Sequence, residues 1–195
     1  MPLAKIQSDI LRLPAAHRDP ESYVAGSTPL NVNAPRYSGD IDVFPDREER
    51  VARAVQEDSA VLQAKATICN GCAREPAMYA AVASKGGDTT KLEWVVDSDY
   101  RFFPTQRDDT FGYGLHPVDL ATNKIMAGRQ EPRDVVDLLT VHDKVLPLGA
   151  VVWAAVGKSL GFTPEGLINE GGARAIPRRT SGAWRATRRL TLRRP

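Results

Sequence analysis

Strand-like alternation of apolar residues is confined to segments before residue 97, and from Pro117 onward the spacing stays helical, which limits the folds available to this chain. Before residue 97, apolar and polar residues alternate in several segments, which is the period of a strand with one buried face. From Pro117 onward, apolar residues recur at intervals of three and four, which is the period of a helix with one buried side. Strands followed by helices predict an α+β fold, in which a small mixed-sheet core is followed by a helical lobe.

The individual segments support this order. Strands are predicted at residues 23–25, 40–44, 78–84 and 90–96. The last two flank Lys85-Gly86-Gly87-Asp88, which favours a hairpin turn because glycine accepts positive φ. Helices are predicted at residues 4–13, 47–65, 117–127, 132–145 and 148–160. Asp46 with Glu49 resembles a capping box for the second of these helices. The predicted organisation is a core with the sheet at 1–115, a helical lobe at 116–170 and a tail at 171–195.

Charge is distributed unevenly along the chain. Eight arginines lie between Arg174 and Arg194, and no acidic residue follows Glu170, so the tail is strongly basic. The formal net charge is +2, and without these eight arginines it is −6. A basic tail can bind nucleic acid by releasing counterions. A disordered tail exposed to solvent is the simpler interpretation, because Gly171, Gly172 and Pro177 interrupt regular structure.

The sequence disfavours a membrane protein and a protein with a signal peptide. No segment approaches the roughly 18 consecutive apolar residues of a membrane span, and charged residues interrupt positions 1–13, where a signal peptide is apolar. We therefore expect a cytoplasmic protein with no membrane partner. Cys69 and Cys72 form a lone C-x-x-C with no second pair and no nearby histidine, which is weak support for a zinc or redox role.

Asp40 and Asp42 carry the clearest chemical signal. Ile41 and Val43 point to one face of the predicted strand, so both aspartates point to the other face. Their like charges then lie several ångströms apart and repel each other unless a cation lies between them. A hard divalent ion, Mg²⁺ or Mn²⁺, is the natural occupant of such a site.

Glu93 and the Gly26-Ser27 pair extend this candidate site. Glu93 lies on the polar face of the strand at 90–96 and is a candidate third metal ligand. The alternative for Glu93 is a cross-strand ion pair on a solvated face of the sheet, with Lys91 as the suggested partner. Gly26 follows a short strand, where a glycine lets the backbone approach closely and where the hydroxyl and amide of Ser27 can bind a phosphate.

Four motifs together resemble a known family. They are V-A-G-S-T-P-L-N at 24–31, S-G-D-I-D-V-F at 38–44, H-P-V-D-L-A-T-N-K at 116–124 and E-P-R-D-V-V-D-L at 131–138. The first two resemble the nucleotidyltransferase superfamily signature, in which G-S is followed after a short spacer by D-x-D. More closely, the chain is similar to the AbiEii/AbiGii toxin family of nucleotidyltransferase-like proteins over roughly residues 10–170.

The resemblance implies a role for each matching residue. Gly26 and Ser27 would cradle the triphosphate of a nucleoside triphosphate, and Asp40, Asp42 and Glu93 would be the catalytic metal ligands. Lys124 would bind the nucleotide and act in catalysis, Arg133 and Asp134 would bind the nucleotide, and Asp137 would be a further catalytic residue.

The activity implied is transfer of a nucleoside monophosphate to an acceptor hydroxyl on RNA, including tRNA, or on a protein. The family also implies a toxin with a cognate antitoxin as its partner. Two alternatives stay open at this point. One is a catalytically inactive nucleotide-binding or structural relative, and the other is a nucleotidyltransferase that modifies small molecules such as antibiotics.

Physical reasoning about the helical half adds a separate expectation. Leu120 and Ala121 neighbour Lys124 on one side of the predicted helix, so the ammonium group is partly desolvated and needs an anion. Asp134 and Asp137 lie one turn apart beside apolar residues, where their like charges need a cation. The alternative to a nucleotide ligand is structural: an internal Lys124–Asp137 ion pair that ties two helices together, which is also compatible with a catalytic role.

Residues 66–72 and 171–195 fit neither the periodic pattern nor the family. With one choice of codons, a one-base shift turns residues 66–71 into Gly-Tyr-Asp-Leu-Gln-Trp, which alternates as a strand does. We hypothesise that both segments are out-of-frame readings, in which case the C-x-x-C and the arginine tail serve no evolved function. Resequencing of the coding DNA tests this hypothesis.

Overall fold

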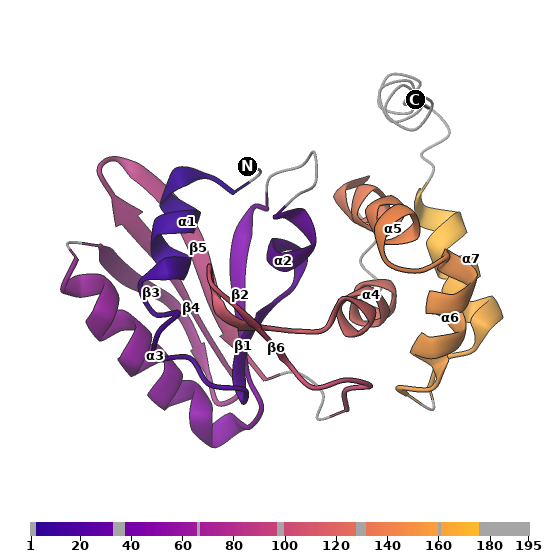
Figure 1. Ribbon diagram of the computed structural model, residues 1–195, viewed down its shortest axis with the longest axis horizontal. Coiled ribbons are helices and arrows are strands. Elements are labelled where there is room, and N and C mark those ends of the chain that lie inside the picture. Colours follow the sequence, from indigo (N-terminus) through magenta and orange to yellow (C-terminus); the bar gives the residue numbers. More distant parts are fainter. Residues whose placement is uncertain are drawn as a thin grey trace. The chain divides into compact units, whose positions relative to one another are not determined.

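The computed structural model describes residues 3–32, 38–65, 67–96, 100–127, 132–159 and 161–175 (Figure 1). Its strands are β1 (Ser22–Ala25), β2 (Asp40–Pro45), β3 (Ile68–Glu75), β4 (Met78–Lys85), β5 (Asp88–Val95), β6 (Gln106–Asp108) and β7 (Gly112–Gly114). Its helices are α1 (Lys5–Arg12), α2 (Ser27–Asn31), α3 (Glu48–Gln63), α4 (Pro117–Met126), α5 (Pro132–Lys144), α6 (Leu148–Val156) and α7 (Pro164–Ala175). The predicted α+β class is confirmed, because the sheet region is followed by helices.

The chain divides into two compact units, residues 1–123 and 124–195. The division falls inside α4, beyond the boundary expected after residue 115. The first unit holds the sheet with α1, α2, α3 and the start of α4, and the second holds the end of α4 with α5, α6 and α7. No helix among the described residues is both long and apolar enough to cross a membrane.

The sheet has seven strands in the order β3-β4-β5-β2-β1-β7-β6. β2 runs parallel to β5 and β1 runs parallel to β7, while the other neighbours are antiparallel, so the sheet is mixed. In this register Asp42 lies opposite Ala25 of β1 on one side and opposite Glu93 of β5 on the other. The centre of the sheet therefore brings the end of β1, the D-x-D strand and Glu93 next to one another.

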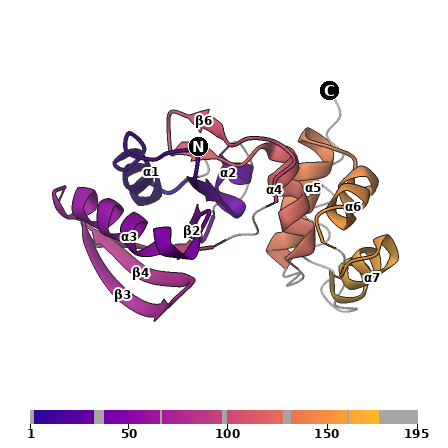
Figure 2. The ribbon, with the colours of Figure 1, turned by 90° about the horizontal axis from the view of Figure 1, so that it is seen from below.

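One face of the sheet is covered by α1 and α3 (Figure 2). Both helices are amphipathic and the central strands alternate, so apolar side chains from both layers meet. The buried residues of this layer include Ile6, Ile10 and Leu11 of α1, Val51, Ala54 and Leu62 of α3, and Ile41, Val43, Leu92 and Trp94 of the sheet.

A polar cluster is enclosed in this core. Trp94 donates its indole N–H to Oδ2 of Asp58 at 2.8 Å, and Nη2 of Arg18 lies 2.9 Å from the same oxygen. The Arg18 and Asp58 side chains are almost fully buried, so each charge needs the other as a partner. The pair ties α3 to the segment that precedes β1.

The opposite face of the sheet carries a smaller buried cluster near β1. Its members are Tyr23, Ala25, Leu115 and Leu120, with Leu30 of α2 and Phe44 of β2 packed against them. Asp40, Asp42 and Glu93 point to this second face because Ile41, Val43 and Leu92 point into the first. All three acidic residues are intermediate in exposure, so this part of the face is reached by solvent.

The β4–β5 hairpin confirms the prediction from its glycines. Gly86 has φ of 61° and Gly87 has φ of 92°, the left-handed region that residues with a Cβ rarely adopt. The turn sets the register in which Ala80 pairs with Glu93. It therefore helps to determine which face Glu93 occupies.

The start of α3 differs from the prediction. The N-cap residue is Arg47 and not Asp46, and no side-chain hydrogen bond of a described residue caps this end. Asp46 instead accepts two hydrogen bonds from the guanidinium group of Arg101, which also lies 5.1 Å from the centre of the Tyr23 ring. A bidentate, charge-assisted pair is stronger than a single cap. The Asp46 carboxylate also raises the pKa of Arg101 above its ordinary value.

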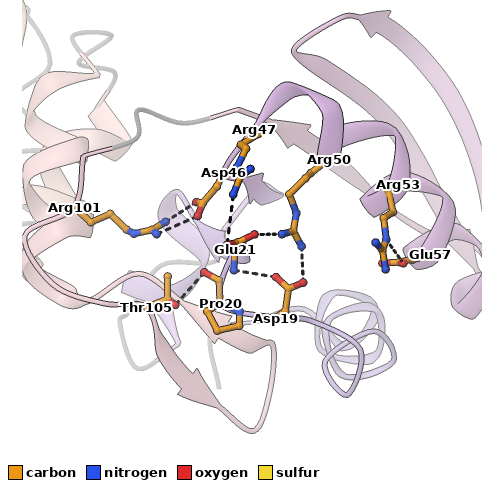
Figure 3. A network of polar contacts seen from close by, with 10 residues as sticks. All are labelled: Asp19, Pro20, Glu21, Asp46, Arg47, Arg50, Arg53, Glu57, Arg101 and Thr105. Atoms are coloured by element: carbon orange, nitrogen blue, oxygen red, sulfur yellow. Dashed lines mark hydrogen bonds and ion pairs between the residues drawn. The ribbon is translucent and has the colours of Figure 1, made fainter.

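The Arg101–Asp46 pair belongs to a polar network at the start of β1 and the end of β2 (Figure 3). Arg50 of α3 binds both Asp19 and Glu21, and Thr105 donates to the carbonyl oxygen of Pro20 at 3.1 Å. The backbone N–H groups of Phe102 and Phe103 donate to the buried carboxylate of Asp119 in α4, at 2.9 and 3.1 Å. These contacts hold the connection between β5 and β6 against the sheet and the start of α4.

The structure describes most of residues 66–72 but only the first part of residues 171–195, the two segments that fit no sequence pattern. Residues 68–75 form β3, which pairs with β4 and shifts register between Gly71 and Ala73. Residues 171–175 continue α7, so the boundary expected after residue 170 falls inside a helix. Residues 176–195, which hold most of the predicted basic tail, lie outside the described residues. The out-of-frame hypothesis stays a prediction.

Candidate metal and nucleotide site

Asp40, Asp42 and Glu93 converge on the partly solvated face of the sheet. One carboxylate oxygen from each residue lies within 4.8 Å of the other two. The D-x-D spacing places the two aspartates on one face, and the parallel register of β2 and β5 places Glu93 opposite Asp42. We call these three residues the acidic cluster.

The acidic cluster fits a divalent metal ion in its chemistry and in its spacing. Carboxylate oxygens are hard ligands, which Mg²⁺ and Mn²⁺ prefer. In an octahedral magnesium site, neighbouring ligand oxygens lie about 3 Å apart and opposite ones about 4 Å apart. Oxygens that already lie within 4.8 Å of one another therefore need only small side-chain rotations to bind one ion. Without a cation, the three like charges repel one another.

Glu93 also forms the ion pair that the sequence offered as an alternative. Nζ of Lys91 lies 2.7 Å from Oε1 of Glu93. The two residues are on one strand and not on neighbouring strands, because positions two apart in a strand share a face. Glu93 therefore belongs to the acidic cluster and is also paired with Lys91.

Gly26 lies directly against the acidic cluster. Its φ is 64°, and a Cβ placed there would lie 1.9 Å from Oδ2 of Asp42. A contact of that length is impossible, so only glycine allows the chain to turn from β1 into α2 at this distance from Asp42. The expected juxtaposition of the Gly26-Ser27 turn and the D-x-D strand is present.

The Ser27 hydroxyl already has a partner within the protein. Ser27 is 8% exposed, and its Oγ lies 2.8 Å from Oγ of Ser38 in a hydrogen bond. The expectation that this hydroxyl binds a phosphate stays a prediction. The turn can also offer a phosphate its backbone N–H groups.

Two residues that support the cluster were missed by sequence reasoning. Thr28 donates its hydroxyl to the backbone oxygen of Asp40 at 2.9 Å, and Ser38 donates to the same oxygen at 2.8 Å. Together they tie α2 to the first residue of β2. Both residues stand inside the motifs quoted above, but hydroxyl residues are common in turns and their spacing alone does not show what they bind.

Lys124, Asp134 and Asp137 form a second cluster, within the second compact unit. Nζ of Lys124 lies 2.6 Å from Oδ1 of Asp134 and 2.8 Å from Oδ2 of Asp137. The Asp137 side chain is fully buried, and that of Lys124 is 14% exposed. The ion pair between α4 and α5 that the sequence left open as a structural alternative is present, and Asp134 is part of it. Arg133, the remaining residue of this motif, is exposed on α5.

A groove on the other face of the sheet contains none of the expected site residues. It has a volume of about 830 Å³ and lies between α3 and the β3–β4 hairpin, with Val51, Val55, Arg74 and Tyr79 among its lining. Tyr79 packs on Trp94, the neighbour of Glu93 in β5, and successive residues of a strand face opposite sides. The acidic cluster therefore does not open into this groove.

No protein-family model matches the chain, and no curated protein matches it. The similarity to the toxin family therefore rests on the four sequence motifs alone.

Proposed function

We propose that this chain is a metal-dependent nucleotidyltransferase, which moves a nucleoside monophosphate from a nucleoside triphosphate to an acceptor hydroxyl. The observation that carries the proposal is the convergence of Asp40, Asp42 and Glu93 beside the Gly26 turn. Three carboxylates favour a divalent ion, and a glycine turn with its backbone close to them favours a phosphate bound to that ion.

In this proposal the chain binds and orients the triphosphate. The acceptor oxygen attacks the α-phosphorus, the bond from that phosphorus to the bridging oxygen breaks, and pyrophosphate leaves with the electron pair. Bound Mg²⁺ or Mn²⁺ would neutralise phosphate charge. Glu93, at the edge of the cluster and half-buried, is the proposed acceptor of the proton from the hydroxyl.

The Gly26-Ser27 turn would bind the phosphates through its backbone, since the Ser27 hydroxyl is already bonded to Ser38. The family resemblance assigns nucleotide binding or catalysis to Lys124, Arg133, Asp134 and Asp137. An ammonium held by two carboxylates can bind phosphate by exchanging one of these partners. We include these residues in the proposal on the strength of the motif match.

The acceptor and the partner come from the resemblance alone. They are an RNA, including tRNA, or a protein hydroxyl as acceptor, and a cognate antitoxin as partner. Eight arginines lie between Arg174 and Arg194, and the net charge of the chain without them is −6. A concentration of positive charge at the C-terminal end would favour binding of an RNA acceptor there.

The test is a transfer assay with α-³²P-labelled nucleoside triphosphates and Mg²⁺ or Mn²⁺, with cellular RNA and protein fractions as acceptors. We expect label on an acceptor with the wild-type chain and loss of that label with Asp40→Ala and with Lys124→Ala. Asp88→Ala is the matched control, because Asp88 is an exposed aspartate at the start of β5, outside the cluster.

The outcomes separate the proposal from its alternatives. Transfer that survives Asp40→Ala would falsify the enzymatic assignment. Metal-dependent binding of a nucleoside triphosphate without transfer to any acceptor favours an inactive nucleotide-binding relative. Label on a small molecule, and not on RNA or protein, favours an enzyme of the antibiotic-modifying kind.

A further inference from the structure

Lys91 stands in the same array of side chains as the proposed metal ligands. In the parallel register of β2 and β5, Asp40 lies opposite Lys91 and Asp42 lies opposite Glu93. All four residues alternate with core residues, so their side chains share the partly solvated face. The array therefore combines three carboxylates with one ammonium group.

This ammonium group is bound to one of the candidate ligands. Nζ of Lys91 lies 2.7 Å from Oε1 of Glu93, the residue that completes the acidic cluster. The Lys91 side chain is 48% exposed, and lysine carries a compact charge on a flexible four-carbon stem. An ion pair of this kind, open to solvent at one end, can separate readily.

Lys91 lowers the net negative charge of the array. The three carboxylates carry −3 when ionised, and Lys91 reduces the sum to −2. A divalent ion bound to Oε1 of Glu93 would compete with the Lys91 ammonium for that oxygen. An ion bound to the other carboxylate oxygen of Glu93 would still lie a few ångströms from the positive charge of Lys91. The ammonium and the metal ion therefore cannot both be bound without repulsion.

We propose that Lys91 is a built-in counter-ion that exchanges with the divalent metal at Glu93 and so sets the metal concentration at which the site fills. This inference rests on the metal site of the proposed function. Lys91 is a positioning residue in it. Before metal binds, Lys91 holds Glu93 in the array and reduces repulsion among the carboxylates, and when metal binds, the pair opens.

The test is binding of Mn²⁺ to the full-length chain, followed by the electron paramagnetic resonance signal of free Mn²⁺. Lys91→Met keeps the unbranched stem and removes the charge. We expect this variant to bind Mn²⁺ about three- to tenfold more tightly than wild type, the scale expected for one unit charge several ångströms away at a solvated site. Lys91→Arg keeps the charge and should stay within about twofold of wild type.

Lys85→Met is the matched control. Lys85 ends β4 and pairs with Asp9 of α1 at 3.7 Å, so its loss changes the net charge equally but outside the array. Thermal unfolding gives a second measurement. In metal-free buffer Lys91→Met should melt below Lys85→Met, because its carboxylates lose the Lys91 ammonium, and Mn²⁺ should remove that difference.

The two proposals fail in different ways. If Lys91→Met and Lys85→Met bind Mn²⁺ equally, the exchange is wrong and the metal site stands. If neither wild type nor Lys91→Met binds Mn²⁺ at millimolar concentration, the metal site is wrong and the exchange falls with it. Lys91→Gln provides the same comparison should Lys91→Met not fold.

Discussion

The two charged clusters of this protein use the same residue types in opposite surroundings. In the first unit, three carboxylates meet one lysine at its edge, and all of them are reached by solvent. In the second unit, one lysine lies between two carboxylates, and Asp137 has no exposed surface. A solvated cluster with excess negative charge can accept a cation at little cost, whereas a buried and paired cluster is costly to open.

The comparison teaches that one substitution, aspartate to alanine, should have different effects in the two places. In the acidic cluster it removes a repelling charge and a metal ligand. In the Lys124 cluster it leaves a buried ammonium group with half of its partners. The first change should alter binding and the second should alter folding.

Asp137→Ala should lower the stability of the second unit by about 3–5 kcal/mol, the range for breaking a buried ion pair. Urea unfolding followed by circular dichroism measures this change. Asp143→Ala is the matched control, since Asp143 is exposed on the same helix and should change stability by less than about 0.5 kcal/mol. Equal effects of the two variants would show that the buried ion pair of Asp137 does not stabilise the second unit.

Asp42→Ala should reduce nucleotidyl transfer by roughly 10²- to 10³-fold, the scale for losing one strong electrostatic contact in an active site. Its stability in metal-free buffer should change by less than about 1 kcal/mol, because the loss of a like-charged neighbour offsets lost contacts. The transfer assay measures the expected loss of activity, and urea unfolding measures the expected small change in stability. A large loss of stability would mean that the acidic cluster supports the fold, which is the result expected for the buried Asp137.

Gly26→Ala should destabilise the first unit by about 1–3 kcal/mol and weaken Mn²⁺ binding. The new methyl group would enter the space of the Asp42 carboxylate at a positive φ. Gly149→Ala is the control in the second unit, because a Cβ at Gly149 of α6 has no neighbour within 4 Å. That variant should be neutral or slightly more stable, by up to about 1 kcal/mol.

Thr28→Val should cost about 1 kcal/mol, because it removes one hydrogen bond to the backbone oxygen of Asp40 while keeping the side-chain volume. Ser38 still donates to the same oxygen, so the strand should keep its position. Thr140→Val is the comparison in α5, where the hydroxyl donates to Val136 of its own helix, and it should have a smaller effect. Calorimetric melting of both variants measures the difference.

The elements that sequence reasoning found are those in which periodicity and local chemistry agree. β2 alternates, so its two faces and the common direction of Asp40 and Asp42 follow from sequence alone. The turn at Gly86 and Gly87 follows from the conformations that glycine accepts. The Lys124–Asp137 pair was expected because a partly buried charge needs a partner.

The elements that were missed depend on contacts that are distant in sequence. β3 has a register shift and little alternation, and it is a strand because β4 offers it an edge to pair with. α2 has five residues, too few to show a helical period. Asp46 was expected to cap α3, and Arg101, far along the chain, binds it instead.

The order of strands and helices, the charged face of β2 and the need for a counter-ion at Lys124 follow from residue spacing and from the cost of unpaired charge. The positions of Glu93 beside Asp40 and Asp42, of Gly26 against Asp42 and of Lys91 in the same array are known from the folded sheet. Strand order and register, which bring residues that are distant in the sequence within a few ångströms, are set by the packing of the whole sheet and cannot be read from any one segment.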